Sequence, residues 1–412
     1  MKIILSAYAC EPGKGSEPAV GWNWALTLAD RGHDVWVITR LNNRENIEAE
    51  LPFVIGANNL RFVYFDYPDS LLKYKKKFSL TRSYYYFWQI AIYFLCKRIV
   101  KRENIDVIHH VTFAGITLPT FLCLLDRSVI LGPVGGGEKM PWKLMGSLGV
   151  KEQFIEIARA VNNYLVRYNP LSNYVFWKVS RILVTSQDSK ELIPKRFHFK
   201  TDVMLAIALP SNFLLKKQEV LYKRNSRVFS MIFAGRLLHW KGIQLILKVL
   251  EKFKVKGEVK LTIVGSGGAK EGLLAESKKL GVSHLINWVS KVEQSRLQEM
   301  YSQHDVFVYP SFHDSGGMAI LEALSYGLPI VCLKTGGPGL IVDESCGFAV
   351  DLEGKGPVEI VEKLHSALND LRIDPELRNK LSRGATERIK RFDWSHMYSS
   401  VYNDINGKFS GS

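Results

Sequence analysis

The stretch Tyr309–Pro338, YPSFHDSGGMAILEALSYGLPIVCLKTGGP, predicts a strand, a loop, a helix and a second strand in succession. The apolar run that ends at Tyr309 is typical of a buried strand. Met318–Tyr326 is rich in helix formers, and Gly327 and Pro329 follow it where a helix commonly ends. This alternation of strand and helix indicates a parallel sheet in an α/β fold.

The loop inside this stretch suits an anionic, hydroxyl-rich ligand. We expect free backbone N–H groups at the positive end of the helix dipole, on Gly316, Gly317 and Met318. Glu322 follows eight residues after Asp314. Because helical side chains lean toward the N-terminus, the Glu322 carboxylate would reach the same mouth and accept hydrogen bonds from a vicinal diol such as a ribose. From this stretch alone, a helix cap beside a solvated acid remains an open alternative.

The composition is that of a globular protein with two or three domains. The chain has 412 residues, of which 47% are hydrophobic and 23% charged. Its formal net charge of +15 indicates an acidic partner, and nucleic acid, an anionic membrane and a nucleotide substrate all qualify. The five scattered cysteines favour a reducing compartment over a disulfide framework or a zinc site. Since no signal peptide is recognisable, we expect a cytoplasmic protein.

Short apolar strands separated by helix-length segments continue through the first half of the chain. They predict a doubly wound sheet, in which ligands bind beyond the carboxyl ends of the strands. The polar groups expected at that edge are Gly15-Ser16, His109-His110, Gly135-Gly136-Gly137-Glu138 and Ser186. At Gly15 the glycine spacing is not a dinucleotide fingerprint, because Pro18 takes the place of the third glycine. This argues against a dinucleotide oxidoreductase, and leaves both a tight turn and a phosphate or sugar contact open.

A break in the pattern after Ile207 predicts a domain boundary. We expect a first domain over residues 1–207 and a second over 208–393, with the C-terminal helix 394–409 packing back on the first. The segment 151–180 is a helical insertion that would either shape an acceptor pocket or belong to the core.

Two cations in the second half of the chain suit a diphosphate. Arg236 follows a strand, and Lys241 opens the next helix. Arginine binds phosphate as a fork and lysine as a point charge. Together with Glu322 and the helix mouth at Gly316-Gly317, they predict a site for a nucleoside diphosphate. Taken without these neighbours, the two cations would equally be surface charge.

Basic clusters flank an aromatic segment at Lys73–Arg102. Its apolar centre, Tyr84–Cys96, is too short to span a bilayer. One interpretation is a long helix packed on the sheet, with solvated ends. The other is a surface that contacts anionic lipid on the cytosolic face of a membrane.

The motifs together resemble the retaining glycosyltransferases of family 4, which have the GT-B fold of two facing doubly wound domains with a cleft between them. The resemblance covers nearly the whole chain. It implies transfer of a sugar from a nucleotide-diphosphate sugar, by preference a UDP-sugar, to a hydroxyl of a glycan or lipid-linked glycan, as in cell-surface polysaccharide assembly. The motifs that carry it are GRLLHWKG (235–242), IVGSG (263–267), the opening stretch with TGGP (335–338), SEPAVGWNWALTLADRGHDVWVITR (16–40) and GPVGGGE (132–138).

The resemblance also implies roles for single residues. Arg236 and Lys241 would hold the donor diphosphate, and Glu322 the donor ribose. Asp314 and the backbone at Ser315, Gly316, Gly317 and Met318 would contact the donor sugar and phosphate. The catalytic set would be His110, Asp314, Arg236 and Lys241, with His109 as the alternative to His110. The other positions are Gly15 and Ser16 over the transferred group, Gly265 and Val292 on the nucleotide, and Gly135, Gly136 and Glu138 on the acceptor side.

Three departures from the family pattern leave the donor sugar more open than the reaction class. Asp314 stands where the first Glu of the paired acids is usual, Gly339 stands where a Glu usually follows TGGP, and Ile207–Pro210 replaces the usual Asn-Gly. No D-x-D sequence occurs, so we expect neither a metal nor another cofactor.

Two other functions remain as alternatives. A relative that binds a nucleotide sugar without catalysis would keep the same site residues. A basic nucleic-acid-binding protein would explain the charge, but it would need a basic groove rather than an organised diphosphate and diol site, and we expect no nucleic-acid partner.

Overall fold

A computed structural model describes residues 1–15, 17–68, 70, 81–113, 115–209, 228–253 and 258–409. The chain forms two compact units. Unit 1 is Met1–Gly137, Val161–Ile207 and Met397–Ser412, and unit 2 is Glu138–Ala160 and Ala208–His396. Both the prediction and the structure have a boundary after Ile207. They differ at Glu138–Ala160, which was expected in the first domain and belongs to unit 2.

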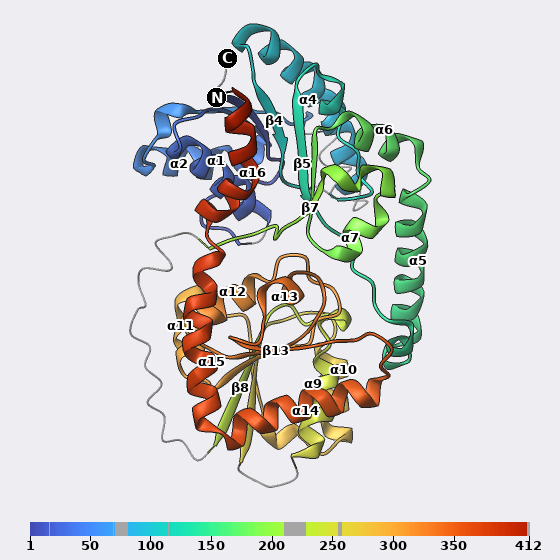
Figure 1. Ribbon diagram of the computed structural model, residues 1–412. Helices are drawn as coiled ribbons and strands as arrows, with labels where there is room; N and C mark the ends of the chain where they lie inside the picture. Colours follow the sequence, from blue (N-terminus) through green and yellow to red (C-terminus); the bar gives the residue numbers. More distant parts are fainter. Residues whose placement is uncertain are drawn as a thin grey trace. The chain divides into compact units, whose positions relative to one another are not determined.

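Unit 1 is built on a parallel sheet with helices on its flanks (Figure 1). The strand order is β3-β2-β1-β4-β5-β6-β7. Since the chain first builds outward from β1 on one side and then returns to its other side at β4, the switch point lies between β1 and β4. The strands are β1 Lys2–Ser6, β2 Asp34–Thr39, β3 Leu60–Tyr64, β4 Val107–His110, β5 Ser128–Val134, β6 Arg181–Val184 and β7 Thr201–Val203.

The helices of unit 1 cover this sheet with their apolar faces. The longest of them, α4, buries Tyr85, Trp88 and Ile92 completely in the core cluster that also holds Trp36 and Ile108. This burial fits the interpretation of the aromatic segment as a packed helix, while residues 73–80 lie outside the described residues. The helices are α1 Glu17–Asp30, α2 Arg44–Glu50, α4 Thr81–Glu103, α6 Pro170–Lys178 and α7 Gln187–Leu192.

Two helices extend over the unit boundaries. Helix α5 (Val150–Val166) begins in unit 2 and ends in unit 1. Helix α16 (Trp394–Phe409) joins unit 1 from Met397 on. There its Tyr398 hydroxyl lies 2.7 Å from His33 Nε2, and its Tyr402 hydroxyl lies 2.9 Å from His109 Nδ1. These contacts join the end of the chain to the first sheet.

Unit 2 is built on a second parallel sheet, with the order β10-β9-β8-β11-β12-β13. Here the chain returns to the other side of β8 at β11, which puts the switch point between these two strands. The strands are β8 Phe229–Ala234, β9 Val259–Val264, β10 Ile286–Val289, β11 Val306–Tyr309, β12 Ile330–Leu333 and β13 Gly347–Val350. The helices are α9 Ile243–Lys252, α10 Lys270–Lys279, α11 Gln294–Ser302, α12 Met318–Ser325, α13 Gly336–Ile341, α14 Pro357–Ile373 and α15 Pro375–Arg388.

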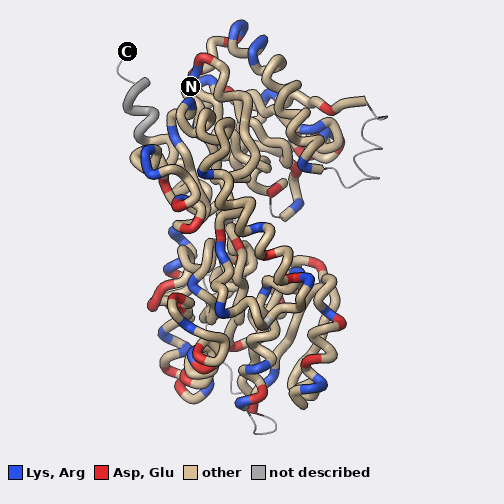
Figure 2. The backbone as a smooth tube through the Cα atoms, turned by 90° about the vertical axis from the view of Figure 1, so that its right-hand side faces the viewer, with Lys and Arg blue, Asp and Glu red and all other residues tan. Residues whose placement is uncertain are grey.

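The predicted fold class is confirmed, because two parallel sheets with flanking helices make an α/β protein of two domains. Charged residues are spread along both units, and Lys and Arg exceed Asp and Glu by 55 to 40 over the whole sequence (Figure 2). Among the helices of the described ranges, none is long and apolar enough to cross a membrane.

Candidate functional site

Two loops at the switch point of unit 2 carry the predicted donor-site charges. The loop after β8 carries Arg236 and leads through a 3-10 turn, His239–Lys241, into α9. The loop after β11 carries Asp314 and leads into α12. Since β8 and β11 are neighbours in a parallel sheet, their carboxyl ends bring the two loops together.

Lys241 and Asp314 form an ion pair between these loops. The Lys241 ammonium lies 2.6 Å from Asp314 Oδ2 and donates to the Tyr309 hydroxyl at 2.5 Å. The Tyr309 hydroxyl in turn donates to the same Asp314 oxygen. Burial acts to raise the pKa of the Asp314 carboxyl, but Lys241 and Tyr309 outweigh it and lower this pKa below its usual value. Asp314 is therefore a carboxylate at neutral pH, and Lys241 already has a counter-charge before any ligand binds.

The other Asp314 oxygen holds the start of α12. Asp314 Oδ1 accepts hydrogen bonds from the backbone N–H of Gly316 at 3.0 Å and of Gly317 at 2.8 Å. The prediction of free N–H groups at the helix mouth is therefore wrong for these two residues, because an Asx turn uses them. Met318 begins the helix and is half-buried, and Ser315 is half-buried in the loop.

Gly317 must be a glycine for two reasons. Its φ is +66°, in the left-handed region that favours glycine. A Cβ atom there would also lie 2.6 Å from Cδ1 of Ile341. The turn that feeds α12 is therefore tightly packed against α13.

Arg236 differs from Lys241 in its surroundings. Its side chain is exposed, and among the described residues it has no ion-pair partner. The structure thus holds one cation of the predicted pair in a fixed network and leaves the other available for an anion. An arginine fork of this kind suits the oxygens of a phosphate.

Glu322 lies on α12 beside a tyrosine. The Tyr301 hydroxyl, on α11, donates to Glu322 Oε2 at 3.3 Å. Burial raises the pKa of Glu322 to about 7, against the smaller lowering effect of the Tyr301 hydrogen bond. Near neutral pH this carboxyl can exist in both protonation states. A group so perturbed is typical of a binding or catalytic site rather than of a solvated surface.

The ends of β9 and β10 lie against the β8 loop. The backbone N–H of Gly235 donates to Val264 O at 3.0 Å, and that of Gly265 donates to Val289 O at 2.9 Å. A Cβ on Gly265 would collide with the carbonyl of Gly235, so only glycine allows the two loops to approach this closely. Val292 is half-buried in the loop after β10. Gly265 and Val292 thus belong to the same edge of the sheet as Arg236.

Glu138 also lies at this edge of unit 2. It is buried, and a Cβ on Gly336, which follows β12, would be 3.1 Å from its Cγ. Arg159 donates to the Glu138 carbonyl at 2.8 Å. The other predicted acceptor-side residues, Gly135 and Gly136, belong to unit 1, so the GPVGGGE motif is divided between the two units.

A buried carboxylate that the sequence analysis did not single out contacts both loops. Glu156 on α5 lies 2.7 Å from His313 Nε2, and its other oxygen lies 3.6 Å from His239 Nε2. Arg159 lies 3.9 Å from the same carboxylate. Burial acts to raise the pKa of Glu156, but the hydrogen bond from His313 and the nearby positive charges lower it. A local sequence pattern could not reveal this contact, which spans 157 residues.

The predicted residues of unit 1 lie near the switch point of its own sheet. His110 ends β4 and is buried, with its ring nitrogens 2.8 Å from the Tyr85 hydroxyl and 3.1 Å from the Ser6 hydroxyl. Burial lowers the pKa of His110 to about 4, so the ring is neutral at pH 7. To contact a substrate, His110 would have to give up one of these bonds.

The alternative histidine and the glycine loop complete this edge. His109 is buried between Tyr402 and the Gly132 carbonyl, and burial lowers its pKa to about 3. Gly15 is exposed in the loop after β1, and Ser16 lies outside the described residues. Gly15 is therefore more accessible than the buried His110.

No cluster of three or more His, Cys, Asp or Glu side chains in the described ranges has the arrangement of a metal site. Metal independence remains a prediction.

Comparison with known proteins finds a family match in the second half of the chain. Residues 217–388 match the family of glycosyl transferases group 1. Sulfoquinovosyl transferase SQD2 of Arabidopsis thaliana is 30% identical over 176 residues, which cover 42% of this chain and 32% of that protein. D-inositol 3-phosphate glycosyltransferase of Paenarthrobacter aurescens is 30% identical over 241 residues, which cover 55% of this chain and 57% of that protein. The chain thus spans well under two thirds of the length of these curated relatives.

Solved structures share the whole fold at low identity. Sucrose-phosphate synthase from Thermosynechococcus elongatus aligns with a TM-score of 0.63 and 15% identity, covering 100% of both chains. Anabaena HepE in complex with UDP aligns with a TM-score of 0.59 and 15% identity, covering 98% of this chain and 99% of that one. The family match and these similarities agree with the predicted resemblance, although they do not test membership of family 4 in particular. Residues 217–388 thus match the glycosyl transferases group 1 family, in agreement with the predicted resemblance.

Proposed function

We propose that this protein transfers a sugar from a nucleotide-diphosphate sugar, by preference a UDP-sugar, to a hydroxyl group of a glycan or lipid-linked glycan, with retention of configuration. The observation that carries the proposal is the arrangement at the switch point of unit 2. An exposed arginine, a lysine–aspartate pair and a carboxyl with a pKa near neutrality occur there within the family region.

The parts of a donor match the groups at this edge. The diphosphate would lie against Arg236 and Lys241, and the ribose diol would donate to Glu322. Gly265 and Val292 would contact the nucleoside, because their loops follow the adjacent strands β9 and β10. Similar solved structures support a nucleotide donor, since HepE of Anabaena was solved in complex with UDP and a pneumococcal O-GlcNAc transferase in complex with UDP and GlcNAc.

The chemical role of Arg236 and Lys241 would be to stabilise the leaving group. As the bond to the anomeric carbon breaks, negative charge grows on the diphosphate, and Arg236 and Lys241 would offset it. Asp314 keeps Lys241 in place through the ion pair and orders the turn before α12. Its role at the transferred sugar remains a prediction, as do those of His110, Gly15 and Ser16 in the first half of the chain.

A panel of UDP-, GDP- and ADP-sugars tests the proposal by ligand-linked thermal stabilisation. One nucleotide sugar should raise the melting temperature, and Arg236→Ala should abolish the rise. Arg82→Ala is a matched control, because this exposed arginine belongs to unit 1 outside the proposed donor site. Stabilisation by no nucleotide sugar, or an equal rise in Arg236→Ala, would contradict the donor site.

Turnover separates the enzyme from a relative that only binds the donor. A transferase should hydrolyse the correct donor slowly even without an acceptor, and Arg236→Ala should reduce that rate. Binding with no hydrolysis and no transfer to any glycan hydroxyl would favour the non-catalytic alternative. Binding of DNA without binding of any nucleotide sugar would favour the nucleic-acid alternative.

A further inference from the structure

Apolar side chains stand exposed on one surface of unit 1. The α5–α6 surface comprises the end of α5, helix α6 and the 3-10 segment Lys195–Lys200. Phe199 is 85% exposed and Trp177 is 61% exposed. The other exposed apolar side chains of this surface are Tyr164, Leu165, Tyr168 and Tyr174. Such a concentration of exposed apolar groups is typical of an interaction site rather than of an ordinary solvated face.

The three segments form one continuous surface. The rings of Phe176 and Phe197 lie 6.2 Å apart beneath it. Lys200 Nζ donates to the carbonyl of Trp177 at 3.0 Å, which joins the segment that carries Phe199 to the helix that carries Trp177. Helix α6 begins only a few residues after α5 ends (Figure 1).

Among the described residues, the cations of this surface have no acidic partners. Residues 161–200 contain seven Lys and Arg against two acids, Asp188 and Glu191. Within the described part of the chain, the five surface cations form no ion pair with a carboxylate; they are Arg167, Lys178, Lys195, Arg196 and Lys200. Those that are held are held by neutral groups: Arg196 donates to the Asn173 amide oxygen at 2.7 Å, and Lys200 donates to the Val179 carbonyl at 2.6 Å.

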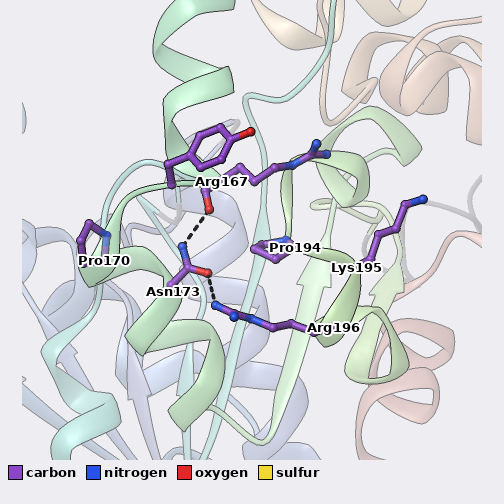
Figure 3. A pocket seen from close by; sticks show the side chains of 7 residues that line it. Arg167, Pro170, Asn173, Pro194, Lys195 and Arg196 are labelled. Carbon is purple, nitrogen blue, oxygen red and sulfur yellow. Dashed lines mark hydrogen bonds between the residues drawn. The ribbon is translucent and has the colours of Figure 1, made fainter.

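Three of these cations line a shallow hollow of about 560 Å³ (Figure 3). Asn173 lies between them, because it donates to the Arg167 carbonyl and accepts from Arg196. The lining residues are Arg167, Tyr168, Pro170, Asn173, Pro194, Lys195 and Arg196. Cations from two separate segments beside an aromatic side chain suit an anionic group that is attached to an apolar body.

We propose that the α5–α6 surface binds an anionic membrane. Tyrosine and tryptophan favour the boundary between lipid headgroups and acyl chains. Leu165 and Phe199 would enter the apolar layer, and the unpaired cations would attract headgroup phosphates, with one headgroup in the hollow. The inference does not require that the protein transfers a sugar.

The positive charge of this surface favours an anionic membrane over a second copy of the chain or an apolar partner. In a symmetric contact with a second copy, the same unpaired cations would face one another, and like charges in an interface oppose association. A purely apolar partner would leave those cations without counter-charges. An anionic lipid surface supplies both the apolar layer and the phosphates. It also differs from the contact predicted at 73–102, where Tyr84, Tyr85 and Trp88 of α4 are buried inside the unit.

Vesicle co-sedimentation of the full chain tests this proposal. Vesicles of phosphatidylcholine alone should bind weakly, and vesicles that also contain phosphatidylglycerol should bind strongly. Lys178→Glu with Lys195→Glu should weaken binding to the anionic vesicles about tenfold or more. Trp177→Ser with Phe199→Ser should weaken it to a similar degree.

Matched controls exist elsewhere on the chain. Phe53 and Ile55 are 82% and 88% exposed, and Lys278 and Lys279 are exposed on α10. Phe53→Ser with Ile55→Ser, and Lys278→Glu with Lys279→Glu, should leave vesicle binding unchanged. All variants should keep the wild-type melting temperature, which excludes misfolding as the cause of lost binding.

Three kinds of result would overturn the proposal. The first is vesicle binding without the expected dependence: either equal binding to neutral and anionic vesicles, or binding that both surface variants retain. Another is a change of oligomeric state in Trp177→Ser with Phe199→Ser without any loss of vesicle binding, which would assign the surface to a second copy. The third is binding of single-stranded nucleic acid, but not of vesicles, that the same variants abolish.

Discussion

The charge of Glu322 should make nucleotide-sugar binding depend on pH near neutrality. Burial raises the pKa of this carboxyl to about 7 in the ligand-free protein. A carboxylate accepts both hydrogen bonds of a ribose diol, whereas the protonated acid spends one oxygen as a donor. If Glu322 holds the ribose, binding requires the charged form and releases a proton from the fraction that is protonated.

The size of the effect follows from this pKa. At pH 6 about one Glu322 side chain in eleven is ionised, and at pH 8 about ten in eleven are ionised. The dissociation constant should therefore be about tenfold larger at pH 6 than at pH 8, a difference of about 1.4 kcal/mol. The dependence should level off at the lower pKa that Glu322 has in the complex.

Isothermal titration calorimetry measures both the affinity and the released proton. Titrations of a UDP-sugar in two buffers of different ionisation enthalpy give the number of protons released at each pH. A nucleotide sugar is preferable to UDP, because a terminal phosphate itself ionises near pH 6. Glu322→Gln keeps the side-chain shape, and it should bind weakly with no dependence on pH. An equal pH dependence in Glu322→Gln, or none in the wild type, would refute the assignment of the ribose to Glu322.

Three further predictions concern the same edge of unit 2. Without ligand, the raised pKa of Glu322 means that the folded state retains its proton above the unfolded pKa, so its contribution to stability is present at low pH and lost as pH rises through about 7. In urea unfolding, the free energy of unfolding should decrease by about 3 kcal/mol from pH 4.5 to pH 7, and Glu322→Gln should lack this decrease. Arg236→Ala and Lys241→Ala should both reduce turnover by roughly two to three orders of magnitude in a donor-hydrolysis assay. Only Lys241→Ala should also reduce the free energy of unfolding, by about 3 kcal/mol, because it leaves Asp314 buried without its counter-charge; equal stability of the two variants would contradict the pairing. Gly317→Ala should cost about 1–3 kcal/mol in thermal unfolding, owing to its positive φ and the contact with Ile341, whereas Gly272→Ala, in open space on α10, should be neutral or stabilising.

Local signals in the sequence were sufficient for the elements of the fold. Arg31-Gly32-His33 separates helix α1, which ends at Asp30, from strand β2, which begins at Asp34. The helix predicted over Met318–Tyr326 corresponds to α12, which ends one residue earlier, at Ser325. Capping glycines and runs of apolar residues act over a few positions, so a single chain displays them directly.

The pairing of side chains was less predictable, because it depends on contacts between distant segments. Asp314 looked like a ligand contact, and the structure shows that it also closes a turn and pairs with Lys241. Tyr309 was visible only as the last residue of a strand, although its hydroxyl joins both charges. These bonds form across neighbouring strands, and a sequence pattern does not specify which polar groups will meet there.

Glu156 shows how far such a contact changes the interpretation of the chain. The sequence placed it in a helical insertion of the first domain, whereas the structure buries its carboxylate between His239, from the β8 loop, and His313, from the β11 loop. The β8 loop carries Arg236 and Lys241, and the β11 loop carries Asp314. One carboxylate from a segment before residue 160 therefore connects both halves of the proposed donor site. A donor domain cut at residue 208 would lose this connection, and His313 would lose the partner that lies 2.7 Å from its Nε2. The proposed donor site is thus complete only when Glu138–Ala160 is counted as part of the second unit.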